Sequence, residues 1–408
     1  MKTICFVVSA FPSVSETFVV NQIVAAKRNG LNIKVLTNKC LPISLSSQLK
    51  ILEEHEILKD IISVNFDMPK NKMVRILKAF FYIICYFRFW IKLEKRYSFK
   101  QGISLLPYKL AYYCQFKFVD VFHIQFATVG NDVAEMKYAG LLNAKVVTTL
   151  HGYDVHFENQ TQLSRLKERY KLLFDVSDFI TANTAFLAEK AEQLFVKPYK
   201  LLLIPMGVDN TFFKLSVPKS INRASTIKLL SVGRLIPLKG HEFGVLVVKK
   251  LVDNGYNICY DIVGEGKEYL ELKSLIDTLG LNDVIRLHGK QNQEFIKKCL
   301  DECHVFLMTS ITDFTGRAEA QGLVLAEAQA MGMPVVAFNS GGVKYSIKSN
   351  ETGILVSEKN IDAMVSSIKE LIETPEKYGK MSIAAIKHVS NELSMVKMGA
   401  RFLALYES

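Results

Sequence analysis

Short apolar runs alternate with segments of helical spacing along the whole chain, and this alternation limits the possible folds more than any other feature. The first run, residues 4–9, is followed by helical spacing in residues 16–28 and by another apolar run in residues 32–37. A second series of the same kind begins at Ile227. Repeated strand–helix–strand units build parallel sheets covered by helices, so the sequence predicts an α/β fold with two Rossmann-like β/α/β domains.

The length of the chain agrees with two domains. A chain of 408 residues exceeds what one hydrophobic core usually serves, and 49% hydrophobic with 22% charged residues is typical of a globular protein. A polar segment around Pro218 separates the two series and is typical of a linker. The predicted parts are an N-terminal domain, a hinge, a C-terminal domain and a terminal helix, at residues 1–207, 208–226, 227–385 and 386–408.

The cysteines indicate a reducing compartment. All seven are scattered without a Cys-x-x-Cys pair, which favours free thiols in a cytoplasm. Cys299, Cys303 and His304 could suggest a metal site, but no second ligand pair follows, and a structural helix face is the better interpretation. The N-terminus is predicted to be a strand and not a signal peptide, and no apolar run is long enough to span a bilayer, so we expect a cytoplasmic protein.

The positive charge is concentrated in the first half. Up to Val217 there are 28 Lys and Arg residues against 18 Asp and Glu, whereas the rest of the chain has 23 against 22. Residues 70–100 contain nine Lys and Arg but one acid, and they surround the apolar block 79–87. We favour a helix that lies on an anionic membrane surface, which would make the protein peripheral on the inner face of the cytoplasmic membrane. The alternative is a helix docked on its own domain.

Two glutamates flank a predicted helix start in the second half. Glu319 and Glu327 are eight residues apart, and a helix that opens near Gly322 puts one acid at its mouth and the other in its first two turns. The free N–H groups of that turn suit a phosphate, and carboxylates hold sugar hydroxyls, so the stretch suggests a nucleotide-sugar site. The alternative is that both acids are merely exposed.

Other chemistry-bearing residues follow predicted strands. Arg234 and Lys239 lie in one loop at a strand's carboxyl edge, where both can reach a diphosphate, although such cations are often only solvated. His151 ends another strand, where a ligand contact and a structural role both remain open. Gly264-x-Gly266 is a weak dinucleotide signal, because a third glycine is not evident.

Five segments resemble the landmarks of family 4 retaining glycosyltransferases, in particular the subgroup that makes colanic acid and other exopolysaccharides. They are FPSVSETF at residues 11–18, HGYDVH at 151–156, IPMGVDNTFF at 204–213, VGRLIPLKG at 232–240, and Glu319 with EAQAMGMPVVA at 327–337. The resemblance implies the GT-B fold, in which two Rossmann-like domains face a central cleft and the last helix returns to the first domain.

The resemblance also implies roles for single residues. The implied catalytic residues are His151, Arg234, Lys239 and Glu319. The implied donor-binding residues are Arg234, Lys239, Gly289, Lys290, Glu319, Gly322, Leu323 and Glu327. The implied acceptor-side residues are Ser15, Glu16, His151 and Asp154. Two alternatives remain open: Ser15 could instead cap a helix, and Asp154 could instead orient its loop.

The activity implied is transfer of a hexose from a UDP- or GDP-sugar to a lipid-linked or glycan acceptor, with retention, in the synthesis of bacterial capsule, exopolysaccharide or O-antigen. Retention fits a front-side displacement, because no carboxylate is obviously a nucleophile. The chain contains no Asp-x-Asp sequence, so no metal or other cofactor is expected, and two cations with a helix dipole can neutralise the diphosphate. The alternative function is a nucleotide-sugar 2-epimerase. Nucleic-acid binding is disfavoured, because the net charge of +11 is its only support.

Overall fold

The strand pairs of the protein are parallel throughout the described residues, and they build two separate sheets. The computed structural model describes residues 1–408 except 14–15, 195 and 216–218. The chain forms two compact units. The first unit consists of Met1–Ala182, Ala188–Leu203 and Arg401–Ser408, and the second consists of Asn183–Leu187 and Ile204–Ala400.

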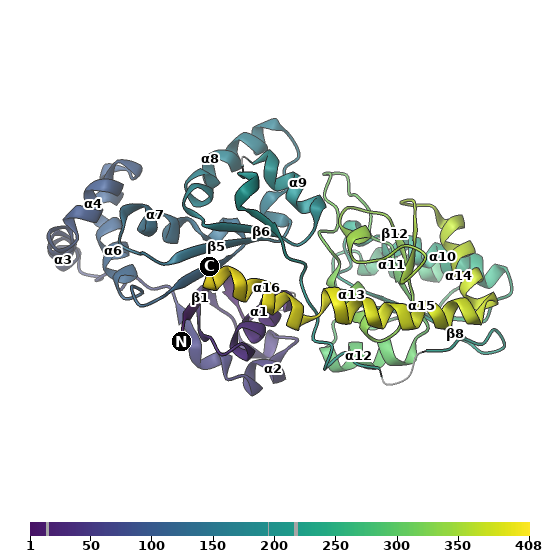
Figure 1. Ribbon diagram of the computed structural model, residues 1–408. Coiled ribbons are helices and arrows are strands. Elements are labelled where there is room, and N and C mark those ends of the chain that lie inside the picture. The colour runs from purple at the N-terminus through teal and green to yellow at the C-terminus, as the bar shows by residue number, and fades with distance from the viewer. Residues whose placement is uncertain (14–15, 195, 216–218) are drawn as a thin grey trace. The chain divides into compact units, whose positions relative to one another are not determined.

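The first unit contains a seven-stranded sheet in the order β3-β2-β1-β4-β5-β6-β7 (Figure 1). Its strands are β1 (Thr3–Phe11), β2 (Asn32–Cys40), β3 (Ile61–Ser63), β4 (Val121–Gln125), β5 (Lys145–Leu150), β6 (Phe179–Ala182) and β7 (Leu201–Leu203). Its helices are α1 (Thr17–Arg28), α2 (Leu49–Glu54), α3 (Lys72–Cys85), α4 (Phe87–Leu93), α5 (Phe99–Ser104), α6 (Leu106–Cys114), α7 (Asn131–Ala139) and α8 (Gln160–Val176).

The second unit contains a six-stranded sheet in the order β10-β9-β8-β11-β12-β13 (Figure 1). Its strands are β8 (Ile227–Val232), β9 (Ile258–Val263), β10 (Ile285–Leu287), β11 (Val305–Met308), β12 (Val335–Phe338) and β13 (Gly353–Val356). Its helices are α10 (His241–Asp253), α11 (Tyr269–Thr278), α12 (Gln293–Glu302), α13 (Leu323–Ala330), α14 (Ile361–Glu373) and α15 (Pro375–His388). Helices α9 (Ala185–Gln193) and α16 (Met395–Glu407) are divided between the two units.

The central strands are apolar because both faces of each sheet are covered. All residues of β11 and β12 are buried, as are all residues of β4. The apolar side of α10 and that of α14 join the core of the second unit with β8 and β9. Strands buried on both faces are near-continuous apolar runs, which is the pattern that predicted them from the sequence. The predicted α/β architecture with two parallel sheets is confirmed.

Each sheet has one place where the strand order reverses. β1 lies between β2 and β4, and β8 lies between β9 and β11. The loops that leave the carboxyl ends of such neighbouring strands diverge, and the crevice between them is where open α/β sheets bind ligands. The reversal points therefore direct attention to the loops after β1, β4 and β5 in the first unit and after β8 and β11 in the second.

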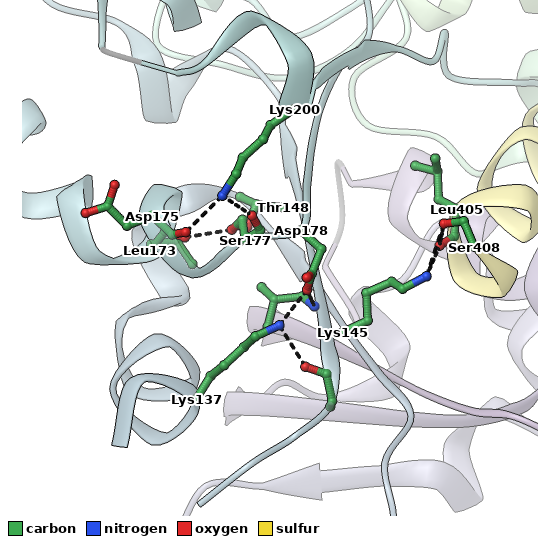
Figure 2. A network of polar contacts seen from close by, with 12 residues as sticks. Lys137, Lys145, Thr148, Leu173, Asp175, Ser177, Asp178, Lys200, Leu405 and Ser408 are labelled. Carbon is green, nitrogen blue, oxygen red and sulfur yellow. Dashed lines mark hydrogen bonds and ion pairs between the residues drawn. The ribbon is translucent and has the colours of Figure 1, made fainter. Parts of the chain in front are cut away.

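The last residues of the chain attach to the first sheet. Figure 2 shows Lys145 of β5 donating from Nζ to the carbonyl oxygen of Leu405 at 2.9 Å and to Ser408 Oγ at 3.1 Å. Close by, Lys137 pairs with Asp178 at 2.5 Å, just before β6. The two contacts of Lys145 fasten the end of α16 to the first sheet. Within the described part of the chain, no helix has both the length and the apolar character needed to cross a bilayer.

Candidate active site

A lysine and a glutamate meet at the reversal point of the second sheet. Lys239 follows β8 and Glu319 follows β11, and the lysine Nζ lies 2.5 Å from a carboxylate oxygen of the glutamate. The two side chains are only 14% and 16% exposed. The aliphatic stem of Lys239 crosses Gly233, where an added Cβ would lie 3.4 Å from it. The structure thus brings together two residues that the sequence separates by eighty positions, and neither is a merely exposed charge.

Glycines let the loop after β9 pass close to the loop after β8. A Cβ on Gly264 would lie 1.8 Å from the carbonyl oxygen of Gly233, and one on Gly266 would lie 2.2 Å from that of Leu235. The N–H of Leu235 also donates to the carbonyl oxygen of Glu265 at 2.9 Å. Any side chain at either glycine would push the two backbones apart. Gly264 and Gly266 let their backbone pack against the loop that carries Arg234 and Lys239. This packing explains the spacing of the two glycines, so a dinucleotide-binding motif is not needed to account for it.

The backbone of the Glu319 loop is fixed by contacts that the sequence did not predict. The N–H of Gly342, after β12, donates to the carbonyl oxygen of Glu319 at 2.7 Å. A Cβ on Gly342 would lie 1.8 Å from the carbonyl oxygen of Ala320, which also accepts from Thr184 Oγ1 at 2.8 Å. The position of Glu319 therefore depends on a glycine twenty-three residues later in the chain.

Gln321 adds a second anchor to the same loop. Its buried amide accepts from the N–H of Met206 at 2.8 Å and donates to that residue's carbonyl oxygen at 2.9 Å. The backbone carbonyl of Gln321 accepts from Ser346 Oγ at 2.9 Å. The local signal was weak, because a glutamine between Ala320 and Gly322 does not reveal a partner more than a hundred residues away.

Helix α13 begins where the Glu319 loop ends. Gly322 precedes it with φ of +78°, a conformation that favours glycine. The first intrahelical contact is donated by the N–H of Leu325 to the carbonyl oxygen of Gly322, so the N–H groups of Leu323 and Val324 point out of the helix without an intrahelical acceptor. They form the positive end of the helix dipole and suit an anionic group.

Glu327 is the buried acid of this helix. Its side chain is on the same face as Leu323, one turn earlier, and side chains on a helix lean toward the N-terminus. The residue is 8% exposed, and no side chain or N–H in the described parts of the chain donates to its carboxylate. Burial raises the pKa of Glu327 to about 7. A buried acceptor with unused hydrogen-bonding capacity next to a helix N-terminus is suited to hydroxyl groups of a ligand.

The remaining donor-side candidates make no direct contact with the charged groups of the Lys239–Glu319 pair among the described residues. Arg234 is exposed, and its side chain has no ion pair within the described ranges. Lys290 is exposed as well. Gly289, with φ of +64°, accepts from the N–H of Gly264 at 2.9 Å, which joins the exit of β10 to the exit of β9. Arg234 adjoins Gly233, over which the Lys239 stem packs, whereas no contact joins Lys290 to either charged residue of the pair within those ranges.

His151 is enclosed at the exit of β5 in the first unit. Its ring lies between Phe18 and Phe126, at centroid distances of 4.3 and 4.6 Å, and its Nε2–H donates to Gln125 Oε1 at 2.8 Å. Burial lowers the pKa of His151 to about 3, so the imidazole is neutral at physiological pH. Phe126 has φ of 73°, which is rare for an aromatic residue, and such strained positions are common at functional sites.

Asp154 holds the loop after His151. Its carboxylate, 1% exposed, accepts from the N–H groups of Ala127, His151 and Gly152 at 2.9, 3.1 and 3.0 Å. These three contacts favour the loop-orienting interpretation of Asp154 over direct contact with an acceptor. Glu16 stands just before α1, and burial raises its pKa. Ser15 lies outside the described residues.

Comparison with known proteins gives a family match for part of the chain and a shared fold. Residues 215–388 match the family described as "Glycosyl transferases group 1". The chain is 30% identical to the putative colanic acid biosynthesis glycosyltransferase WcaL of Salmonella typhimurium over 251 residues, which are 62% of this chain and 61% of that protein. It is 25% identical to the amylovoran biosynthesis glycosyltransferase AmsK of Erwinia amylovora over 95% of both chains.

Among solved structures, Alr3699/HepE of Anabaena in complex with UDP superposes over the whole of both chains with a TM-score of 0.75 at 18% sequence identity. At that identity the superposition shows the fold alone. It confirms the predicted GT-B architecture of two Rossmann-like parts.

Proposed function

We propose that the chain, whose residues 215–388 match the family "Glycosyl transferases group 1", transfers a hexose from a nucleoside-diphosphate sugar to a lipid-linked or glycan acceptor, with retention of configuration, in exopolysaccharide synthesis. The observation that carries this proposal is the part-buried Lys239–Glu319 pair beside the open N-terminus of α13. The names of WcaL and AmsK, which refer to colanic acid and amylovoran, support the polysaccharide. The solved complexes of HepE with UDP and with UDP-glucose support a uridine nucleotide.

The donor's diphosphate is assigned to the cations and the helix start. Lys239 has three N–H donors, so it can keep its contact with Glu319 while another proton reaches a phosphate oxygen. The guanidinium of Arg234 is exposed and can reach the same anion. The N–H groups of Leu323 and Val324 add the positive end of a helix dipole. Negative charge grows on the diphosphate as the glycosidic bond breaks, so these groups stabilise the transition state more than the bound donor.

The two glutamates are assigned to hydroxyl groups. Glu319 has a second carboxylate oxygen beyond the one that faces Lys239, and this oxygen can accept from hydroxyls of the transferred sugar. Glu327 has unused acceptors in a buried position and is assigned to the ribose. Gly289 and Lys290, at the exit of β10, are assigned to the base. Positioning of this kind is worth several orders of magnitude in rate when the reacting groups are held rigidly.

The chemical step that fits retention is a front-side displacement. The bond between the anomeric carbon and the phosphate oxygen breaks, and the oxygen of the acceptor hydroxyl bonds to that carbon from the same face. The departing phosphate oxygen accepts the proton of the hydroxyl. Neither step requires a protein carboxylate to bond to the sugar. The cations and the helix dipole supply the charge neutralisation that a bridging metal gives other enzymes, so we propose a metal-independent reaction with no cofactor.

The acceptor side is assigned to the first unit. His151, neutral and held by Gln125, can contact a sugar hydroxyl through its remaining ring nitrogen. Glu16 stands at the loop after β1, where ligands of such sheets bind. Asp154 is assigned a positioning role, because its carboxylate is already used by three N–H groups. The family and the relatives described above are glycosyltransferases by name, so the epimerase alternative has no observation in its favour.

Thermal denaturation in the presence of nucleotide sugars tests this proposal. We expect at least one UDP- or GDP-sugar to raise the melting temperature in the presence of EDTA, because a ligand that binds only the folded state stabilises it. The increase should disappear in Lys239→Ala and persist in Lys273→Ala, an exposed lysine of α11. Stabilisation that requires a divalent cation, or that survives in Lys239→Ala, would contradict the proposal.

A further inference from the structure

Helix α3 presents its apolar face to solvent. The exposed side chains are Met73 (73%), Val74 (50%), Ile76 (52%), Leu77 (66%), Phe80 (62%), Phe81 (60%) and Ile84 (67%). At 100° per residue, Leu77 and Ile84 lie near the centre of this face, and the others lie within about one quarter turn on either side. A helix of a globular protein normally turns such a face inward, so the orientation of α3 is reversed.

The opposite side of α3 anchors it to the first unit. Ala79 is its one buried residue. The ring of Tyr82 packs edge-to-face against Tyr108 of α6 at 5.4 Å, and Tyr108 Oη donates to the carbonyl oxygen of Arg75 at 2.8 Å. The helix is therefore held by a narrow aromatic side and not by its apolar face. The helix does dock on its own domain, as the alternative interpretation held, but it docks through this side and leaves its apolar face exposed.

Helix α4 extends the same surface. Phe87 is 53% and Ile91 50% exposed, whereas Phe89 and Leu93 are buried beneath them. Trp90 donates from Nε1 to the carbonyl oxygen of Gly102 at 2.8 Å, which fixes the helix in place. In Figure 1, α3 and α4 lie at an outer edge of the first unit, with α6 and α7 between them and the sheet. We refer to the exposed apolar side chains of Lys72–Leu93 as the α3–α4 face.

Positive charge borders the α3–α4 face. Between Lys70 and Lys100 there are nine Lys and Arg residues, and Glu94 is the one acid. The exposed cations are Lys70, Lys72, Arg88, Lys92, Lys95, Arg96 and Lys100. Two copies of such a surface would bring like charges together, whereas anionic headgroups beside an apolar interior complement both of its features.

We propose that the α3–α4 face inserts its apolar side chains into the interfacial layer of an anionic lipid bilayer, with the bordering lysines and arginines on the headgroups. The protein then binds the membrane peripherally, through the first unit. Long basic side chains can keep their charge at the headgroups while their stems lie along the apolar layer. This proposal does not rest on the proposed function, since vesicle binding requires no turnover. If the chain transfers sugar to a lipid-linked acceptor, the same contact brings it to the surface that holds the acceptor.

Vesicle co-sedimentation with a matched pair of variants tests the proposal. Leu77→Ser/Ile84→Ser removes two side chains from the face, and Leu270→Ser/Ile383→Ser removes two similarly exposed ones from α11 and α15, which are 74% and 55% exposed. We expect the wild type and the second variant to bind vesicles of equal parts phosphatidylcholine and phosphatidylglycerol. The first variant should bind at least about tenfold more weakly, and salt should weaken wild-type binding.

Three outcomes would overturn the proposal. The first is that the wild type ignores the mixed vesicles or binds pure phosphatidylcholine equally well. The second is that both variants bind alike. The third is a wild-type dimer, detected by light scattering, that Leu77→Ser/Ile84→Ser converts to a monomer, since this would make a second copy the occupant. Unchanged melting temperature and unchanged stabilisation by a nucleotide sugar in this variant would separate loss of membrane binding from misfolding and from failure of the proposed function.

Discussion

The reversal points of the two sheets differ in what they leave available to a ligand. At the second sheet, an exposed Arg234, the open helix start at Leu323 and the unpartnered carboxylate of Glu327 retain binding capacity. At the first, the carboxylate of Asp154 already accepts three N–H groups, and the neutral ring of His151 is packed between two phenylalanines. The comparison teaches that the second edge keeps groups suited to an anion and to hydroxyls, whereas the side chains of the first edge are largely held by contacts within the protein.

The largest expected effect is at the charged edge. Glu319→Ala removes the acceptor assigned to the transferred sugar, and it also leaves Lys239 without its partner. We expect the transfer rate to fall by at least about a hundredfold while the circular dichroism spectrum stays native. Glu271→Ala, an exposed acid on α11, is the matched control. Unchanged turnover in Glu319→Ala would show that this edge is not where catalysis occurs.

A second prediction tests whether the Glu319 loop is rigid. Gly342→Ala places a methyl group against the carbonyl oxygen of Ala320, at 1.8 Å before any relaxation. We expect the free energy of unfolding to fall by about 2–4 kcal/mol, since the clashing atom is backbone. Gly379→Ala, in α15 with open space around it, should instead stabilise by up to about 1 kcal/mol. Chemical denaturation measures the free energy of unfolding of both variants. Equal changes would mean that the Glu319 loop moves to accommodate the methyl group at little cost.

The third prediction uses the pH dependence of Glu327. The pKa of this carboxyl is about 7 in the folded protein, against 4.5 ordinarily, so the native state holds the proton more tightly. Stability is therefore lost as pH rises from about 4.5 to about 7. Glu327→Gln cannot ionise, and its free energy of unfolding should exceed that of the wild type by up to about 3 kcal/mol near pH 8, but not near pH 4. A difference independent of pH would contradict the burial argument.

A bound nucleotide sugar should favour the wild type over Glu327→Gln, opposite to the order expected without ligand near pH 8. Ribose hydroxyls donate to an ionised carboxylate better than to a neutral amide, so a saturating nucleotide sugar should stabilise the wild type more than Glu327→Gln at about pH 8. Melting temperatures with and without the ligand measure this difference. Equal stabilisation of both proteins would place the ribose elsewhere.

The smallest expected effect is at the edge of the first sheet. Asp154→Asn keeps the shape of the side chain but replaces one acceptor oxygen by a donor that faces an N–H group. We expect the free energy of unfolding to fall by about 1–3 kcal/mol. The affinity for the nucleotide sugar should not change, which calorimetric titration can measure. A large loss of donor affinity in Asp154→Asn would break the contrast between the two edges.

The fold and part of the site follow from local patterns. Apolar runs predicted the strands because both faces of each sheet are covered, and Lys239 and Glu319 stand at strand exits that the same runs locate. Tertiary partners could not be predicted in this way. The spacing of Gly264 and Gly266 suggested a ligand, but its physical cause is the backbone of a neighbouring loop.

The orientation of α3 shows the same limit. Helical periodicity reveals that an apolar face exists, but it does not indicate whether the face turns inward or outward. That choice is made by Tyr82 and Tyr108, whose contact fixes the other side of the helix to α6. Similarly, the loop-holding role of Asp154 depends on three N–H groups, one of which belongs to Ala127 in a different loop.

A crystal structure with the nucleotide sugar that most raises the melting temperature tests the central claim most directly. The account predicts the diphosphate within hydrogen-bonding distance of Lys239 Nζ and of the N–H groups of Leu323 and Val324, with the ribose on Glu327. A diphosphate bound away from the N-terminus of α13, with the Lys239–Glu319 pair untouched, would contradict it.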